Sequence, residues 1–268
     1  MKIKSYLAKP FAGYIYKQIK KGIETAVEDQ QATLNSLIKI GSKTIFGKEH
    51  GFDSIKTAED FAKQVPIRDY EQFKPYIEKI KEGKHNVLWK GQPIYLAKTS
   101  GTTSGVKYIP ITKESIPNHI NTARNALLCY MSETGNTNFA DGKMIFLSGS
   151  PELERIGGIP TGRLSGIVNH HVPKYLRANQ LPGYETNCIE EWEEKLEKIV
   201  LETIQQNMTL ISGIPPWMQM YFDKLADKSG KKIGELFPNF SVMVQGGVNF
   251  EPYKAKLYES IGRKVDCI

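Results

Sequence analysis

The stretch Lys98-Thr-Ser-Gly-Thr-Thr-Ser-Gly-Val-Lys-Tyr-Ile-Pro110 decides how the rest of this chain is interpreted. Hydroxyl side chains occupy five of the six positions that follow Lys98, and Lys107 adds a positive charge. The two glycines of the stretch permit backbone angles that let successive N–H groups turn toward one anion. We interpret the stretch as a phosphate-binding loop made by Thr99, Ser100, Gly101, Thr102, Thr103, Ser104, Gly105 and Lys107.

The loop is not a Walker A loop, in which a Gly-Lys-Ser/Thr sequence leads directly into a helix. Here Val106 separates Gly105 from Lys107, and residues 108–111 are strand-forming and contain Pro110. Residues 93–97 are also strand-like, so we expect the loop to join two strands. An ordinary Ser/Thr/Gly turn is the alternative, but it explains the glycines and not the combination of hydroxyls with a lysine.

Length and composition are those of an ordinary globular protein, with 268 residues, 40% hydrophobic and 24% charged. Three cysteines without paired spacing argue against a disulfide framework or a metal knuckle, which indicates a reducing compartment such as the cytoplasm. No apolar run approaches the ~18 residues of a membrane span. The basic N-terminus lacks the apolar core and cleavage site of a signal peptide.

The net charge of +7 is concentrated at one end of the chain. Residues 1–21 hold six lysines and no acidic residue, which leaves +1 for the remainder. An amphipathic helix is predicted there, with lysines outside and Tyr14 beside an apolar stripe of Leu7, Phe11, Ile15 and Ile19. Pro10 and Gly13 are expected to interrupt it early, which weighs against membrane-surface binding. No nucleic-acid partner is expected.

Several helices are predicted before the first strand. Residues 23–40 are helical and end at Gly41. Thr57-Ala-Glu-Asp60 is a capping box, and Asp69 is predicted to cap the helix that follows. This order predicts a helical layer over residues 1–85 and an α/β core over residues 86–268.

Three short apolar runs in the second part predict buried strands of a parallel sheet, each ending in a Gly/Ser or Gly/Gly turn. They cover residues 144–147, 209–213 and 240–244. Ligands of open α/β sheets collect at the carboxyl ends of such strands, which places Ser148 and the Gln245-Gly246-Gly247 turn at a binding edge. The glycine-rich segment 157–166 is expected to be either a mobile lid or a long surface loop.

Other polar and aromatic groups give weaker signals. His170 and His171 would point to opposite faces of a strand, and no spacing suggests a metal site; His171 is the better candidate for a function. Residues 189–206 predict an amphipathic helix whose early glutamates are solvated. Trp217 and Tyr221 follow the second strand on a helix and either line an acyl pocket or belong to the core.

The segment Thr99-Ser-Gly-Thr-Thr-Ser-Gly-Val-Lys107 resembles the phosphate-binding motif of the adenylate-forming superfamily, which includes acyl-CoA synthetases, luciferases and nonribosomal adenylation domains. Three other segments resemble a narrower group. They are Val65-Pro-Ile-Arg-Asp-Tyr-Glu71, the stretch from Gly149 to Gly166, and Gly246-Gly-Val-Asn-Phe-Glu-Pro252. Over its whole length the chain is similar to a bacterial member of the auxin-responsive acyl-acid amido synthetase family.

The resemblance implies a large N-terminal adenylating domain and a two-step ligase reaction. ATP and Mg²⁺ activate a small-molecule carboxylic acid as an acyl-adenylate, and an amino acid then forms the amide. The resemblance gives Lys107 the catalytic role of stabilising phosphate charge, and assigns Gln245, Gly246 and Gly247 to the adenine region. Ser148, His171, Trp217 and Tyr221 are the predicted acyl pocket, and no protein metal ligand is predicted.

The chain departs from the family where it stops. Family members continue with a Tyr/Glu motif, an acidic ribose motif and a C-terminal lid domain, so we expect an incomplete and inactive fragment. Two alternatives stay open: a non-catalytic nucleotide- or acyl-binding module, and a basic interaction protein whose glycine loop is only a turn.

Overall fold

The computed structural model describes residues 3–99, 105–172 and 177–268. The described chain forms two compact units, each built from separate stretches of sequence. Unit 1 comprises Met1–Tyr16, Thr122–Pro151 and Val168–Ile268, and unit 2 comprises Lys17–Asn121 and Glu152–Ile167. Each unit has its own sheet.

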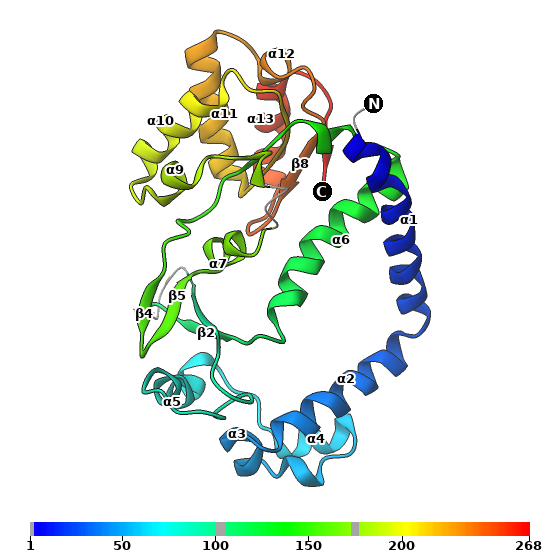
Figure 1. Ribbon diagram of the computed structural model, residues 1–268, viewed down its shortest axis with the longest axis vertical. Coiled ribbons are helices and arrows are strands. Elements are labelled where there is room, and N and C mark those ends of the chain that lie inside the picture. Colours follow the sequence, from blue (N-terminus) through cyan, green and yellow to red (C-terminus); the bar gives the residue numbers. More distant parts are fainter. Residues whose placement is uncertain (1–2, 100–104, 173–176) are drawn as a thin grey trace. The chain divides into compact units, whose positions relative to one another are not determined.

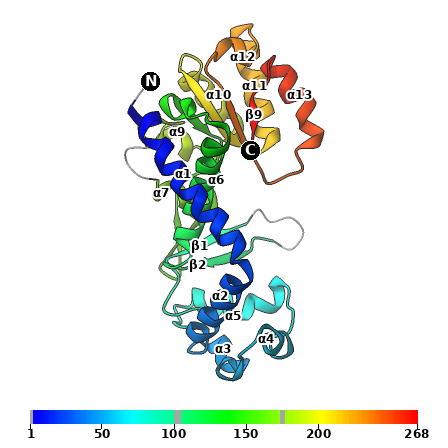
Figure 2. The same cartoon turned by 90° about the vertical axis from the view of Figure 1, so that its right-hand side faces the viewer.

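Unit 2 begins with helices, as predicted. Figure 2 shows them gathered at one end of the unit. Their side chains form an aromatic core that includes Phe46 and Phe52. The predicted capping box at Thr57 is confirmed, and the predicted cap Asp69 forms a second capping box with Gln72. The helices are α2 (Ala26–Gly41), α3 (Ile45–Glu49), the 3-10 helix η1 (Phe52–Ser54), α4 (Ala58–Gln64) and α5 (Tyr70–Lys81).

The sheet of unit 2 has four strands in the order β2-β1-β5-β4. β1 (Tyr95–Lys98) pairs antiparallel with β2 (Tyr108–Ile111) and parallel with β5 (Ile159–Arg163), and β5 pairs antiparallel with β4 (Glu154–Ile156). Leu96 packs in the cluster that contains α5 residues, and its neighbour Ala97 packs in a different cluster, because successive side chains of a strand face opposite ways.

The expectation of a lid or surface loop over residues 157–166 was wrong. Gly157 and Gly158 form the turn of the β4–β5 hairpin, and the segment then enters α7 (Leu164–His170). Thr161 in β5 is fully buried. The glycines of this segment show no periodic spacing in the sequence because they have different structural roles. Two make the turn, while Gly162 lies where a side chain would clash with Leu153.

The sheet of unit 1 is parallel throughout, with the order β6-β3-β7-β8-β9. Its strands are β6 (Gln180–Leu181), β3 (Lys143–Phe146), β7 (Met208–Gly213), β8 (Val242–Gln245) and β9 (Asp266–Cys267). The three buried strands predicted from apolar runs are therefore confirmed as β3, β7 and β8. They are adjacent, so their carboxyl ends lie along one edge.

Helices cover both faces of this sheet, as Figure 1 shows. Ile145, Ile211 and Met243 face a cluster formed with α10 (Trp192–Thr203), α11 (Pro215–Ser229) and α13 (Glu251–Ile261). The alternate residues face a second cluster with α1 (Ile3–Glu24) and α6 (Ile116–Thr134). Short elements complete the unit: the 3-10 helix η2 (Asn138–Asp141), α9 (Tyr184–Cys188) and α12 (Ile233–Leu236). Such two-sided coverage explains why the strands are continuous apolar runs.

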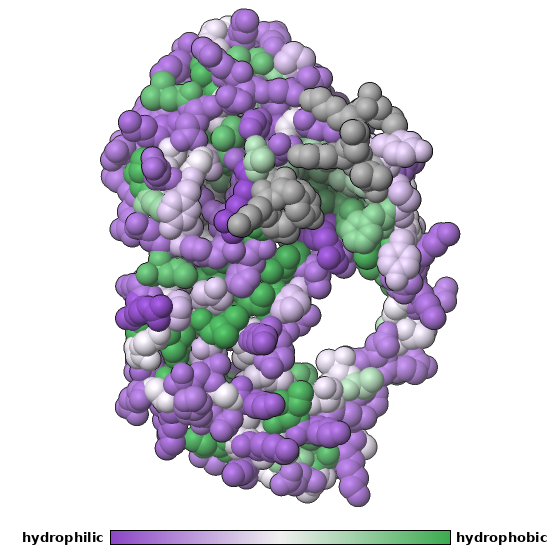
Figure 3. Space-filling view, viewed as in Figure 1, coloured by the Kyte–Doolittle hydropathy of each residue, from purple (hydrophilic) through white to green (hydrophobic). Residues whose placement is uncertain are grey.

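α1 differs from its prediction in two respects. It passes through Pro10 and Gly13 without interruption, and Pro10 is exposed. Its buried contact centres on Ala12, with no exposed surface, whereas Phe11 is 46% exposed. A small residue allows the helix to approach its neighbours closely, which an apolarity count does not anticipate. In Figure 3 the outer edge of α1 and α2 is mainly hydrophilic, and no helix of the described residues is long and apolar enough to cross a membrane.

Candidate functional site

The predicted phosphate loop connects β1 to β2 in unit 2, as the sequence indicated. Lys98 and Tyr108 form the last strand pair, and beyond it the Thr99 N–H donates a hydrogen bond of 3.0 Å to the Lys107 carbonyl. This bond closes the base of the loop. The predicted residues Ser100, Gly101, Thr102, Thr103 and Ser104 lie outside the described residues.

Gly105 is one position of the loop where the backbone requires glycine. It is exposed and has a φ of +79°, which L side chains rarely adopt. A Cβ atom there would meet no other atom, so the requirement is conformational and not steric. The left-handed residue turns the chain into Val106 and Lys107.

Lys107 and Lys98 flank the loop but differ in their partners. The Lys98 ammonium is 2.6 Å from the Glu154 carboxylate, so its charge is largely compensated. The half-buried Lys107 ammonium lies 5.5 Å from the centroid of the Tyr70 ring and forms no ion pair with any described residue. Of the two lysines, Lys107 is the one whose charge remains available to an anion.

Unit 1 brings other predicted residues to the carboxyl edge of its sheet. Gln245 is the last residue of β8 and is followed by Gly246 and Gly247, and Ser148 follows β3 one residue after Leu147. Gly247 has a φ of +85°, and a Cβ atom there would be 3.1 Å from the Ile214 side chain. Gly246 is exposed, with no atom within 4 Å of a would-be Cβ atom. The turn therefore offers open backbone to a ligand.

Gln245 carries an unusual acceptor. Its side-chain Oε1 is buried and has no hydrogen-bond partner among the described residues, while its N–H donates to the Ile268 carbonyl at 3.0 Å. An unpaired buried acceptor costs about 1–3 kcal/mol. Such atoms mark places where a ligand or water supplies the missing donor.

Ser148 lies beside two polar residues that the sequence prediction missed. The Ser148 hydroxyl accepts a hydrogen bond of 3.4 Å from the Asn187 amide, and the Ser148 carbonyl accepts one of 3.0 Å from the Lys195 ammonium. Lys195 is only 3% exposed and also donates to the Asn187 carbonyl at 2.6 Å. The sequence did contain a signal that Lys195 is buried. Lys195 is three residues after Trp192 and four before Ile199, so it lies on the apolar stripe of α10.

His171 does not lie in a strand, so the strand argument that separated it from His170 does not apply. His171 follows α7 directly and is half-buried, and this burial lowers its pKa below the ordinary value of 6.5, with a smaller contribution from the charge of His170. His170 ends α7, with its Nε2 atom 2.7 Å from the Pro151 carbonyl oxygen. The two rings therefore have separate surroundings.

The two predicted aromatic residues of α11 have different environments. Trp217 is partly buried and stacks on Trp192, with ring centroids 4.4 Å apart. Tyr221 has no exposed surface, its hydroxyl is 2.7 Å from that of Thr203, and burial raises its pKa. The core alternative left open by the sequence describes Tyr221, which we therefore leave out of the site proposed below.

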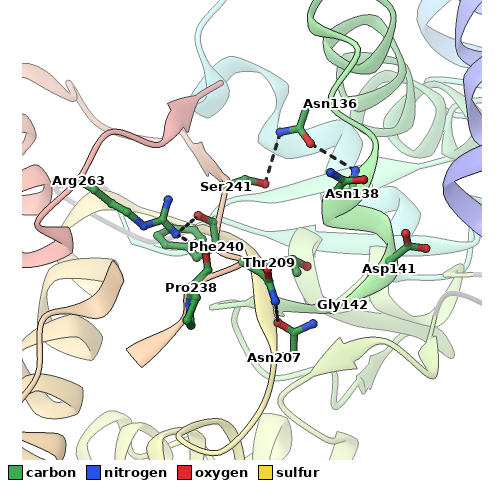
Figure 4. A pocket seen from close by; sticks show the side chains of 11 residues that line it. Asn136, Asn138, Asp141, Gly142, Asn207, Thr209, Pro238, Phe240, Ser241 and Arg263 are labelled. Carbon is green, nitrogen blue, oxygen red and sulfur yellow. Dashed lines mark hydrogen bonds between the residues drawn. The ribbon is translucent and has the colours of Figure 1, made fainter. Parts of the chain in front are cut away.

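A cavity in unit 1 lies at the other edge of the sheet, at the amino ends of β3, β7 and β8. It measures about 610 Å³, and Figure 4 shows Asn136 and Asn138 on one side and Arg263 on the other. Arg263 already donates to the carbonyls of Phe237, Pro238 and Phe240. None of the residues predicted for nucleotide or acid binding lines this cavity.

Metal-binding side chains are not clustered in the described part of the chain. No group of three or more His, Cys, Asp or Glu side chains is placed to hold an ion there. Magnesium on a nucleotide needs only one or two protein carboxylates, because phosphates and water supply its other ligands. The described residues are thus compatible with magnesium that arrives bound to ATP.

Comparison with known proteins connects these features to a family. The model of the GH3 family N-terminal domain matches residues 15–182. This chain belongs to the GH3 family. The family resemblance carried by the phosphate-loop and flanking motifs is therefore confirmed, although its bacterial origin stays a prediction.

The GH3 relatives are amido synthetases. Jasmonoyl-L-amino acid synthetase JAR4 of Nicotiana attenuata is 25% identical over 158 residues, which are 57% of this chain and 27% of that protein. A probable indole-3-acetic acid-amido synthetase, GH3.13 of Oryza sativa subsp. japonica, is 40% identical over 68 residues, or 25% and 14% of the two chains.

Solved structures show the same fold. AtGH3.15 acyl acid amido synthetase in complex with 2,4-DB matches 91% of this chain with a TM-score of 0.71 at 13% identity. A 2-hydroxyisobutyryl-CoA ligase in complex with 2-HIB-AMP and CoA matches 90% with a TM-score of 0.54 at 16% identity. The chain spans 52% and 48% of these two structures. The predicted α/β fold of an adenylate-forming N-terminal domain is confirmed.

Proposed function

We propose that this GH3 chain binds ATP and takes part in activating a carboxylic acid for conjugation to an amino acid. The observation that carries the proposal is Lys107, a cation that has no carboxylate partner among the described residues and lies at the hydrogen-bonded base of a hydroxyl- and glycine-rich loop. Membership of a family whose relatives are acyl acid amido synthetases supports the same reaction.

The proposed reaction has two steps. A carboxylate oxygen of the acid attacks the α-phosphorus of ATP, the bond from that phosphorus to the bridging oxygen breaks, and pyrophosphate leaves. The amine of an amino acid then attacks the acyl carbon, AMP leaves, and the amine loses a proton. Magnesium would screen the phosphate charges when it is bound with ATP.

The roles of this chain's own residues follow from their positions. Lys107 would stabilise negative charge on the departing phosphates. The Gln245-Gly246-Gly247 turn would present open backbone and an unpaired acceptor to the adenine base. Ser148, His171 and Trp217 remain the proposed acid-binding residues. The chemistry needs no side-chain nucleophile.

Replacing Lys107 with Ala tests the phosphate assignment. We expect ATP affinity to fall about 10- to 100-fold, as for loss of a charge-assisted hydrogen bond, and adenosine affinity to stay unchanged. Isothermal titration of each ligand measures both values, with Lys113→Ala as the control at an exposed lysine of the same unit. Equal weakening of ATP and adenosine binding would show that Lys107 does not face phosphate.

A second measurement separates the ligase from a non-catalytic nucleotide-binding module. Release of pyrophosphate that depends on both a carboxylic acid and an amino acid would support the ligase. Saturable ATP binding without such release would support the module. Absence of ATP binding by the unaltered chain would overturn both.

A further inference from the structure

We infer that Tyr70 is a positioning residue for the phosphate loop, holding Lys107 through its ring and the first residue of β2 through its hydroxyl. Tyr70 lies outside the phosphate-loop stretch, 37 positions before Lys107 in the sequence. The inference rests on the proposed function only for what Lys107 binds. The contacts that carry it are independent of any ligand.

Tyr70 contacts two successive residues at the end of the loop. Its ring centroid is 5.5 Å from the Lys107 ammonium, and its hydroxyl oxygen accepts a hydrogen bond of 2.8 Å from the Tyr108 N–H. The hydroxyl contact fixes where the backbone leaves the loop, and the ring contact restricts where the lysine side chain can lie. One side chain thus restrains both the backbone and the charge.

The Tyr70 hydroxyl also provides a hydrogen-bond acceptor for a backbone N–H group at the edge of the sheet. β2 is an edge strand, and hydrogen-bonding directions alternate along it, so the N–H groups of residues 108 and 110 point away from β1. Pro110 has no N–H, and the Tyr108 N–H is bound by Tyr70. The outer side of β2 therefore has no free donor at these positions and joins α5 at a defined place.

The position of Tyr70 is fixed by its own segment. Tyr70 is the first residue of α5, and the preceding Asp69 forms a capping box with Gln72, in which each side chain bonds to the other's backbone N–H. The ring of Tyr70 also packs against the apolar cluster that contains Ile77 and Ile80. The segment from Val65 to Glu71 resembles the family, but its sequence alone suggested no function. Placing Tyr70 beside the phosphate loop is the role that we infer for it.

An aromatic partner suits a phosphate-binding lysine better than a carboxylate does. A ring face attracts the ammonium through its quadrupole and leaves the full positive charge in place. A carboxylate, such as Glu154 beside Lys98, compensates that charge. Tyr70 therefore orients Lys107 without competing with phosphate for it.

The positioning itself is tested without ligand, by NMR of the lysine ε-methylene groups in the unaltered chain and two variants. The ring current of Tyr70 should shift the Lys107 signals, and this shift should persist in Tyr70→Phe and disappear in Tyr70→Leu. Tyr76→Leu is the matched control, since Tyr76 lies on the same helix with the Lys79 ammonium 5.3 Å from its ring centroid. Identical Lys107 signals in the unaltered chain and Tyr70→Leu would overturn the inference.

The consequence for binding is tested with inorganic tripolyphosphate, ATP and adenosine. Tyr70→Leu should weaken tripolyphosphate and ATP about two- to five-fold, as expected for loss of an exposed cation–π contact, and leave adenosine unchanged. On a Lys107→Ala background the same substitution should cause a smaller loss, because only the contact with the Tyr108 backbone is then removed. Tyr70→Phe should retain the ring effect while the Tyr108 amide exchanges faster with solvent.

The two proposals fail in different ways. If the unaltered chain binds neither ATP nor tripolyphosphate, the proposed function is wrong, and the NMR experiment still decides whether Tyr70 holds Lys107. If the chain binds ATP but Tyr70→Leu weakens ATP binding equally with and without Lys107, Tyr70 does not act through Lys107 and the inferred positioning of that lysine is overturned.

Discussion

Individual residues of the site are distinguished by their partners more than by their chemical type. Lys98, Lys107 and Lys195 are all lysines near a predicted binding edge, yet one is paired with a carboxylate, one faces an aromatic ring and one is buried against carbonyls. Sequence identifies Lys107 because its neighbours are glycines and hydroxyls. It does not identify Tyr70, because that contact joins residues far apart in the chain.

His171 gives a residue-scale prediction about pH. Because burial lowers its pKa below 6.5, the folded protein binds fewer protons than the unfolded chain as pH falls below that value. Its contribution to the free energy of unfolding is therefore fully present above pH 6.5 and is lost as pH falls toward its lowered pKa. We expect His171→Gln to flatten the dependence of urea-unfolding free energy on pH between about 7.5 and 5.5.

The control for this experiment is His85→Gln, at an exposed position. NMR of the imidazole protons should also show His171 titrating below pH 6.5. A His171 midpoint above that value would contradict the account of its burial.

At the scale of elements, helix caps and buried strands were predictable because their signals are local. The capping boxes at Thr57 and Asp69 and the apolar runs of β3, β7 and β8 depend on residues within a few positions of each other. The β4–β5 hairpin was missed because β5 is identified by its pairing with β1, about 60 residues earlier. The glycine content of residues 157–166 led instead to the wrong expectation of a lid or surface loop.

The hairpin turn provides a prediction with a matched control. Gly157 and Gly158 both have positive φ, +57° and +80°, but only at Gly157 would a Cβ atom approach the Lys81 carbonyl oxygen, at 1.8 Å. Gly158→Ala should cost about 1 kcal/mol of stability from backbone strain, whereas Gly157→Ala should cost several times more, because α5 or the hairpin must move. Chemical denaturation measures both values. Equal losses would show that the hairpin does not pack against Lys81.

At the scale of the whole molecule, the two units have separate cores. Leu96 belongs to a cluster of unit 2 and Leu196 to a cluster of unit 1, and both are fully buried. Each replacement by Ala should cost about 2–5 kcal/mol. We expect the loss of hydrogen-exchange protection to centre on the unit that carries the substitution. Equal loss in both units would show that they unfold as one cooperative block.

The discontinuous make-up of unit 2 has a consequence for how the chain is made on the ribosome. Strand β1, which leads into the phosphate loop, pairs on its other side with β5, which is synthesised about 60 residues later. The strand pairing that supports the loop can therefore form only after residue 163 has left the exit tunnel. Unit 1 is completed later still, because β9 adds to its sheet at residues 266–267. At ~5–20 residues per second, the interval is on the order of ten seconds. At the start of this interval the sheet of unit 2 has its full set of strands, while the sheet of unit 1 still lacks β6, β7, β8 and β9.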